Sequence, residues 1–434
     1  MNSGRNEKMI SEAKKFIREL RPHTTNIFWS NLNQMVVTGA ALVVSIIFTR
    51  LGDEEGVLYG QYIFVLGVFG LLSIVSIPGV QVVVFRATAQ GYDGVYRKAT
   101  IFSVLWSMAG IVLLVITGVF FYFFKTKILG LSLIVSAFFF PFMTSLRNWI
   151  LFLKGRSEFG RLAFYNLVKL LTSIIAVGLS IFFTGNLILV LGAYFLVNSG
   201  FNIFYHQKSL DTLTNNELDK GWKRQSYVLT VLSLSTIIFG KVDIVLLGLL
   251  FEKTGQMGEV AVYGLVMKFV DVFFSTIKST MEGVVPSLYK SKTITIRYFY
   301  KFFLLSFLVP FVLWWVVKYP ILFLYPERYS DVIFYSQVYL TIIPIYFLNL
   351  TATHFLIKYK LDKEINISRI ISIIAVVVFY SSLIPLYGVW GGVISSMLYF
   401  IVQLVVNLLL LKIRKPKKQM EIVRRGKDFK GIRF

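Results

Sequence analysis

Five polar side chains recur along one apolar stretch, residues 262–288: Lys268, Asp271, Ser275, Lys278 and Glu282. If the stretch is a helix, this spacing holds the five within about 80° of one another. Charged groups inside a membrane span are costly and usually face a water-filled cavity or a charged partner. Ammonium groups bind phosphate, and carboxylates can carry a coupling ion. The spacing therefore predicts a charged cavity.

A structural interpretation competes with this prediction. Lys268 and Asp271, and likewise Lys278 and Glu282, have the spacing of intrahelical ion pairs. Such pairs would hold the helix against its neighbours without contacting a substrate. Both interpretations stay open on the sequence alone.

Other embedded charges add to the candidate site. Lys241 and Lys169 lie in two further apolar stretches, so the embedded lysines outnumber Asp243, Asp271 and Glu282 by one. This slight positive excess favours an anionic cargo such as a diphosphate. Asp243 and Asp271 are candidates for carrying a proton or sodium ion, although Asp243 is equally suited to pairing with Lys241.

Three more residues complete the cavity candidates: Asn31, Arg50 and Arg86. Asn31 makes the start of the first apolar stretch polar and could meet sugar hydroxyls. Contacts between helices are the alternative for an amide at this position.

Twelve apolar stretches must position these residues. Hydrophobic residues make up 56% of the 434 residues, charged residues 15%, and the mean hydropathy is +0.70. Stretches of about twenty apolar residues are long enough to cross a bilayer as helices. We expect spans at 28–49, 59–85, 99–123, 128–150, 162–183, 187–205, 227–250, 262–288, 302–324, 332–353, 368–386 and 389–411.

The distribution of Lys and Arg predicts the orientation. With the N-terminus inside, the expected cytoplasmic segments carry 35 Lys and Arg, and the expected outer segments carry 6. Cytoplasmic loops of membrane proteins carry such an excess. We therefore expect a multi-pass membrane protein with both termini in the cytoplasm.

The same spans predict an all-α integral membrane protein built from two six-helix bundles. The expected segments are a cytoplasmic amphipathic N-terminal segment (1–27), a first bundle (28–205), a cytoplasmic linker (206–226), a second bundle (227–411) and a basic tail (412–434). A basic tail of this kind can contact anionic lipid headgroups.

Several chemistries are excluded or disfavoured. The chain has no cysteine, its three histidines are scattered, and it lacks the phosphate-binding, zinc-protease and hydrolase motifs. We therefore expect no metal, no cofactor and no enzymatic activity. The net charge of +23 lies on short loops and one tail, which argues against nucleic acid as a partner.

The two halves share a weak internal repeat. Tyr59-Gly60 and Gly79-Val80 in the second span recur at the same separation as Tyr263-Gly264 and Gly283-Val284 in the eighth. Six spans per half is an even number, so the repeats would be parallel and related by an axis along the membrane normal.

At these residues the sequence resembles a known family. The run from Thr49 through Tyr59-Gly-Gln-Tyr, then Ile77-Pro-Gly-Val and Phe85-Arg-Ala, resembles the opening signature of bacterial and archaeal polysaccharide flippases. Asp243-Ile-Val-Leu-Leu-Gly248 resembles it in the second half. These O-antigen and capsule-repeat flippases belong to the multidrug/oligosaccharidyl-lipid/polysaccharide exporter (MOP) superfamily.

The resemblance implies a multidrug-extrusion-like fold that flips polyprenyl-diphosphate-linked oligosaccharide from the cytoplasmic to the outer leaflet. It implies a lipid-linked oligosaccharide and membrane lipids as partners, along with other polysaccharide-assembly proteins, in a prokaryotic plasma membrane. A proton or sodium gradient would be the energy source if Asp243 or Asp271 carries the coupling ion. Two alternatives stay open. One is a cation-coupled multidrug antiporter of the same fold. The other is a membrane-embedded glycan polymerase or ligase, which the short outer loops disfavour.

Overall fold

The computed structural model describes residues 28–290, 296–358 and 361–413. The expected amphipathic segment 1–27 and nearly all of the basic tail lie outside the described residues. The first described helix is Phe28–Leu51.

The other elements follow it in chain order. They are α2 (Val57–Leu72), η1 (Ser73–Ser76), α3 (Gly79–Ala89), α4 (Gly94–Phe124), α5 (Lys127–Phe138), α6 (Phe140–Thr144), η2 (Leu146–Asn148), α7 (Trp149–Gly155), α8 (Phe159–Thr184), α9 (Leu187–Leu210), α10 (Trp222–Phe239), α11 (Val242–Thr254), α12 (Met257–Lys290), α13 (Ile296–Val316), α14 (Lys318–Leu324), η3 (Glu327–Tyr329), α15 (Asp331–Leu340), α16 (Ile343–Lys358), α17 (Asp362–Tyr387) and α18 (Val389–Ile413).

The helices confirm the expected all-α membrane architecture. Within the described residues, eight helices are long and apolar enough to cross a membrane, and four bent pairs bring the number of candidate spans to 12 when each pair counts as one. A helix satisfies its own backbone hydrogen bonds, which a span must do in lipid. The described residues contain no strand.

Apolar side chains cover the outside of these helices. Phe123, Phe183 and Phe323 are each more than 70% exposed. In water such a surface would aggregate, whereas in a bilayer it contacts lipid tails. The exposed apolar faces and the span lengths together indicate a multi-pass membrane protein.

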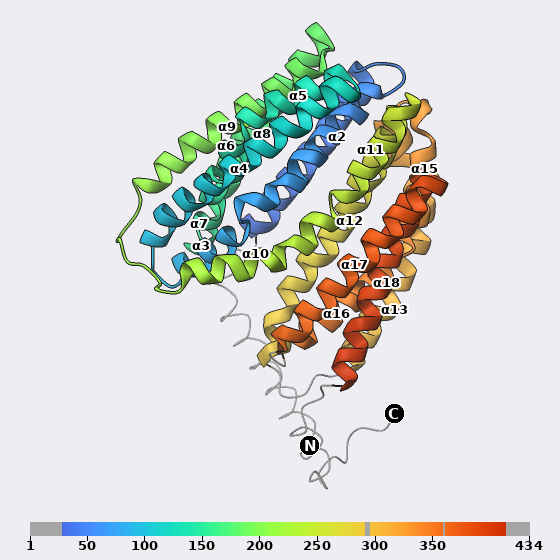
Figure 1. The fold of residues 1–434 in the computed structure, drawn as a ribbon. Helices are drawn as coiled ribbons and strands as arrows, with labels where there is room; N and C mark the ends of the chain where they lie inside the picture. Colours follow the sequence, from blue (N-terminus) through green and yellow to red (C-terminus); the bar gives the residue numbers. More distant parts are fainter. Residues whose placement is uncertain (1–27, 291–295, 359–360, 414–434) are drawn as a thin grey trace.

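The first-half helices α2 to α9 lie on one side of the molecule and most second-half helices on the other (Figure 1). Helix α10 is the exception, because it packs along α3 and then turns into α11 (Figure 1). At this contact the backbone N–H of Gly79 donates to Thr230 Oγ1 at 3.0 Å. The division into a 28–205 bundle and a 227–411 bundle stays a prediction.

The connection between the halves is shorter than the expected 206–226, because α9 continues to Leu210 and α10 begins at Trp222. Asp93, buried before the start of α4, holds it in place. The Asp93 carboxylate accepts hydrogen bonds from the hydroxyl and backbone N–H of Thr214 and from Arg156. The linker is therefore bound to the first half.

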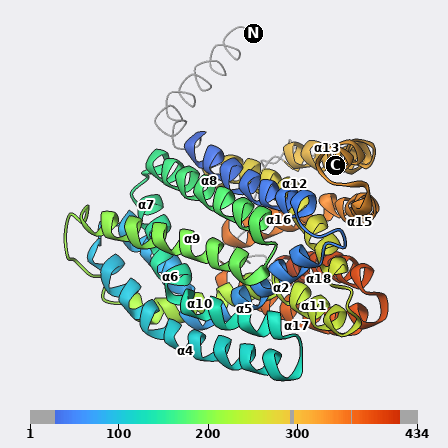
Figure 2. The same cartoon turned by 90° about the horizontal axis from the view of Figure 1, so that it is seen from above.

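Glycines let α2 and α12 pack closely where the halves meet. A Cβ on Gly60 would lie 1.9 Å from the carbonyl oxygen of Met257, and one on Gly264 would lie 2.2 Å from the Ile63 side chain. The two Tyr-Gly pairs of the sequence repeat therefore lie at the same helix crossing. Viewed from above, α2 lies beside α11 (Figure 2), and both α11 and α12 pack against α2.

We call the end where the Phe28–Leu51 helix begins and α18 stops the terminal face. At the opposite face the two halves are joined by polar contacts. Glu252 accepts from Lys125 at 3.1 Å and from Thr126 at 2.8 Å, and Arg328 donates to the Thr49 carbonyl at 2.6 Å. These contacts hold the halves together on that side.

A candidate substrate cavity

A cavity of about 630 Å³ lies between the Phe28–Leu51 helix and the second-half helices. Its lining comes from that helix and from α10, α12, α16, α17 and α18. On α16 and α18 the lining residues include His354 and Asn407, which lie near the ends of those helices at the terminal face. The cavity therefore lies toward the terminal face, away from the contacts that join the halves.

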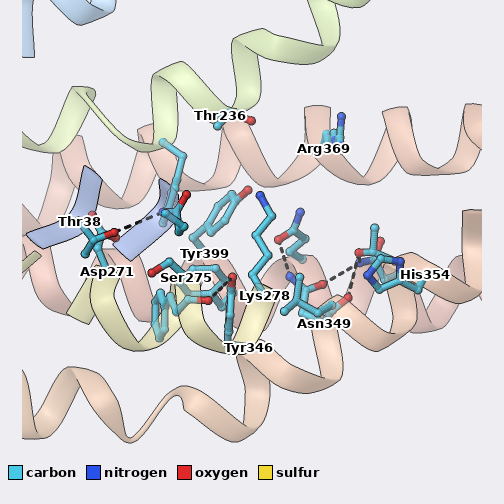
Figure 3. Close-up of a pocket in the computed structure, with 18 of the residues that line it drawn as sticks. Thr38, Thr236, Asp271, Ser275, Lys278, Tyr346, Asn349, His354, Arg369 and Tyr399 are labelled. Atoms are coloured by element: carbon cyan, nitrogen blue, oxygen red, sulfur yellow. Dashed lines mark hydrogen bonds between the residues drawn. The ribbon is translucent and has the colours of Figure 1, made fainter. Parts of the chain in front are cut away.

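The five polar residues that the spacing predicted to share one face lie on α12, and we call them the α12 stripe. Four of them line this cavity: Lys268, Asp271, Ser275 and Lys278. Asp271 and Lys278 are exposed, although they belong to a helix that packs inside the molecule. Figure 3 places Lys278 in the middle of the lining, with Asp271 toward one end and His354 toward the other. The side chain of Glu282 lies outside the described residues.

The direct Lys268–Asp271 pair expected from the alternative interpretation is not formed. Four ion pairs join described residues, and none of them involves either side chain. Their charges are therefore presented to the cavity without a mutual contact within 4.0 Å.

Two basic residues that we did not predict also line the cavity. Arg369 comes from the second turn of α17, and His354 comes from α16. Among the described lining residues, three side chains are lysine or arginine: Lys268, Lys278 and Arg369. One is a carboxylate, that of Asp271. The summed charge of the described lining residues is therefore positive.

An amide network covers the wall between α16 and α18. Asn349 donates to Gln403, and Asn407 donates to Asn349 Oδ1 at 2.7 Å and to Thr353 Oγ1 at 3.2 Å. The network fixes the orientation of these polar groups, which are of the kind that bind sugar hydroxyls.

Stacked aromatic rings form another part of the wall. Phe274 stacks on Tyr346 with centroids 4.4 Å apart, and Phe239 stacks on Tyr399 at 4.0 Å. An apolar and aromatic surface with a few fixed polar groups is typical of a small-molecule site.

Solved structures share this arrangement of helices. An inward-facing multidrug resistance MATE family transporter of the MOP superfamily aligns over 90% of this chain and 99% of its own, with 14% identity and a TM-score of 0.64. The lipid II flippase MurJ in an inward closed conformation aligns over 89% of this chain and 87% of its own, with 14% identity and a TM-score of 0.65. The chain has the fold of the MOP superfamily.

A third structure with the MOP fold is described by the polarity of its pocket. This MOP superfamily transporter from Pyrococcus furiosus is 14% identical, with a TM-score of 0.51 over 90% of this chain and 95% of its own. Its reported "reverse polarity of binding pocket" is said to suggest a different function. No protein-family model and no curated protein sequence matches the chain.

Within this MOP fold, Asp243 lies apart from the cavity in a buried polar cluster. It is fully buried in the first turn of α11 and accepts from the Tyr263 hydroxyl at 2.7 Å and from the backbone N–H of Ile244 at 2.8 Å. Ser396 lies 3.4 Å from the Tyr263 hydroxyl and 2.8 Å from that of Tyr380. Three helices besides α11 therefore meet at this cluster: α12, α17 and α18.

Lys241 is not an ion-pair partner of Asp243 among the described residues. Its aliphatic chain packs against α2, where a Cβ on Gly70 would lie 2.9 Å from the lysine Cε. Lys241 contacts the first half and does not line the cavity.

The structure places the remaining predicted site residues outside the cavity lining. Arg50, near the end of the first helix, donates to the carbonyls of Phe323 at 2.7 Å and Leu324 at 3.1 Å. Arg86 is exposed in the last turn of α3, and Asn31 is exposed near the start of the first helix. Two later polar residues of that helix differ in their surroundings. Gln34 lines the cavity, whereas Asn33 accepts a hydrogen bond from Asn166 at 2.7 Å.

Proposed function

We propose that this protein is a transporter that flips a polyprenyl-diphosphate-linked oligosaccharide from the cytoplasmic to the outer leaflet. The observation that carries this proposal is the positive lining of the cavity by Lys268, Lys278 and Arg369. A diphosphate carries negative charge, and charge-assisted contacts to lysine and arginine are the strong ones. The prenyl chain stays in the bilayer while the polar head enters the cavity.

The other walls suit the glycan part of such a cargo. Fixed amides such as Asn349 and Asn407 offer donors and acceptors to hydroxyls. The stacked rings near Phe274 and Phe239 offer apolar faces. A cavity of about 630 Å³ accepts the diphosphate and the first sugars, and a longer glycan would extend toward the terminal face.

Alternating access supplies the movement. The cavity lies toward the terminal face, and the halves are joined at the opposite face by Glu252 and Arg328. If the termini are cytoplasmic, as the Lys and Arg asymmetry predicts, the cavity lies toward the cytoplasm and would accept cargo from that side. Breaking the opposite contacts would release the cargo into the outer leaflet. The membrane would then be a prokaryotic plasma membrane.

Coupling to a proton or sodium gradient is assigned to Asp243, with Asp271 as the second candidate. Asp243 is buried where four second-half helices meet, so a change in its charge would alter the packing between them. Asp271 faces the cavity, where cargo and coupling ion would compete directly.

A cation-coupled multidrug antiporter is a second candidate, and two observations favour it. The exposed Asp271 carboxylate is of the kind that binds an organic cation. The alignment also covers 99% of a MATE family transporter and 87% of MurJ.

Transport by the full chain in proteoliposomes separates the two candidates. One assay follows the flipping of a fluorescent polyprenyl-diphosphate-linked oligosaccharide, and the other follows gradient-driven movement of ethidium, an organic cation. The proposal expects flipping of the lipid-linked sugar and no ethidium movement above protein-free liposomes. Ethidium transport without flipping of the lipid-linked sugar would replace the flippase with the antiporter.

A further inference from the structure

Lys169, on α8 of the first half, is a buried lysine that has no counter-charge in the part of the chain that the structure describes. It is 7% exposed, and among the described residues its ammonium forms no hydrogen bond and no ion pair. The ammonium lies over the face of the Trp149 ring, 5.4 Å from the centroid. A buried ammonium needs hydrogen-bond acceptors for its three N–H donors, and the face of an aromatic ring does not provide an N or O acceptor.

Lys169 belongs to a polar stripe on α8. Asn166, Lys169 and Ser173 are all buried and share one helix face because of their spacing. Asn166 donates to Asn33 of the first helix at 2.7 Å, and Ser173 accepts from Asn198 of α9 at 2.8 Å. The neighbouring side chains on this face are therefore fixed by hydrogen bonds, while Lys169 between them is not.

The other charge that acts on Lys169 is also a cation, Arg147, which lies two residues before the Trp149 ring that Lys169 contacts. Arg147 lies in η2, within the second part (Phe140–Gly155) of a span that bends by 65°, and its side chain is exposed. An exposed guanidinium inside a span is costly in lipid, so it faces an aqueous space. Two cations that no described carboxylate pairs with repel each other and favour a bound anion.

Helix α8 also contacts the Phe28–Leu51 helix, which lines the substrate cavity. Asn33 bonds to α8 beside Lys169, and the next residue of the same helix, Gln34, lines the cavity. A group of the cargo could therefore pass along the Phe28–Leu51 helix from one site to the other.

We propose that Lys169 and Arg147 form a second anion subsite, in the first half, for a phosphate of the cargo. The inference rests on the proposed function and extends it, because the anionic head would then be held from both halves. Contact with both halves gives the cargo a way to bias their relative movement.

The test measures the affinity of the purified full-length protein for two probes, geranylgeranyl diphosphate and inorganic pyrophosphate. Lys169→Met and Arg147→Met should each weaken binding about tenfold, the loss of one charge-assisted contact. Lys169→Arg should stay within about threefold of the wild type, because the charge is kept. Weakening for either probe supports the subsite, and a difference between the probes tells a lipid headgroup from a free phosphate.

Lys208→Met is the matched control. Lys208 also lies over a ring, 4.8 Å from the Phe204 centroid, but it is exposed at the end of α9. Its replacement should leave both affinities unchanged. In the absence of probe, Lys169→Met should unfold no more easily than the wild type, since a neutral chain replaces an unpaired ammonium.

Two results would overturn the inference. Wild-type affinity of Arg147→Met for both probes would remove the subsite, even if Lys169→Met failed to fold. So would wild-type affinity of a folded Lys169→Met. If Lys278→Ala then still weakened binding, the proposed function would stand without the second subsite; if it did not, both would fail.

Discussion

Asp243 is the residue whose surroundings most constrain the mechanism. Its carboxylate is fully buried, and the Tyr263 hydroxyl and the Ile244 backbone N–H donate to it. Neither donor neutralises a negative charge. A carboxylate held this way is suited to binding a proton or a sodium ion and releasing it when the helices move apart.

Replacing Asp243 with Asn should separate coupling from binding. The amide keeps the shape and can still accept from Tyr263, but it cannot carry the charge. We expect transport by Asp243→Asn to lose its dependence on an imposed proton or sodium gradient, while affinity for geranylgeranyl diphosphate changes less than about threefold. Fully gradient-driven transport by both Asp243→Asn and Asp271→Asn would exclude the two residues from coupling.

Single-residue spacing predicted part of the candidate site. The period of the α12 stripe placed Lys268, Asp271, Ser275 and Lys278 on one face, and these four line one cavity. The spacing did not indicate Arg369, because this residue lies at the very start of its expected span (368–386), next to the charges of the preceding loop. Arg50 was expected at the cavity, but hydropathy cannot show that its guanidinium would meet the free carbonyls at the end of α14.

At the scale of elements, the α2–α12 crossing depends on glycine. The backbone carbonyl of Met257 occupies the place of a Cβ on Gly60, so alanine there requires the two helices to separate.

We expect Gly60→Ala to lower the free energy of unfolding by about 1–3 kcal/mol, as overpacking does. Gly200→Ala on α9 is the matched control, because no atom lies within 4 Å of its Cβ position. Alanine favours a helix, so Gly200→Ala should keep or raise the melting temperature. Equal melting temperatures for the two variants would contradict the close packing of α2 on α12.

The linker between the halves provides a prediction of pH dependence. Burial raises the pKa of Asp93, but the hydrogen bonds from Thr214 and Arg156 prevail and hold the pKa below its ordinary value. A lowered carboxyl pKa stabilises the fold above the ordinary value and loses that effect as the pH falls through the folded-state pKa. The linker should therefore stay attached at neutral pH and loosen only in acid below 3.8.

Hydrogen exchange of residues 211–221, corrected for intrinsic rates, measures this attachment. Protection in the wild type should persist from pH 7 to below pH 4 and then fall. In Asp93→Asn it should already be about tenfold lower at pH 7, since one charged hydrogen-bond acceptor is lost. Protection in the variant equal to the wild type at pH 7 would show that Asp93 does not hold the linker.

The bends within spans could not be predicted from hydropathy. The apolar stretch 128–150 is continuous in sequence, yet it bends by 65° between Phe138 and Phe140 and continues as far as Gly155. The span count depends only on length and apolar content, which the bend does not change. The packing of α10 on α3 likewise depends on the contact of Gly79 with Thr230, which no periodicity reveals.

At the scale of the whole molecule, the contacts of Glu252 with Lys125 and Thr126 hold the opposite face together. If transport needs this face to open, weakening the contacts should favour the open form. The chain contains no cysteine, so a single cysteine can report accessibility without background.

We therefore expect Ser275→Cys, in the cavity, to react with a membrane-impermeant maleimide chiefly from the terminal side. Adding Glu252→Gln should raise labelling from the opposite side severalfold, because loss of a charged pair shifts the population by about 1 kcal/mol. Lys253→Gln, a neighbour outside these contacts, serves as the control. Unchanged labelling in Glu252→Gln would show that these contacts do not hold the opposite face closed.

The central claim is that the positive cavity carries a diphosphate-linked glycan across the membrane. It is tested most directly by the flipping of a polyprenyl-diphosphate-linked oligosaccharide in proteoliposomes by three variants: Lys278→Ala, the pair Lys268→Met with Asp271→Leu, and Lys208→Met. The claim predicts that the first two lower cargo affinity by about one to two orders of magnitude, at roughly 1.5–3 kcal/mol per charged contact. It predicts that Lys208→Met flips as the wild type does. Full flipping activity in both Lys278→Ala and the neutral pair would contradict the claim, because the stripe would then serve packing alone.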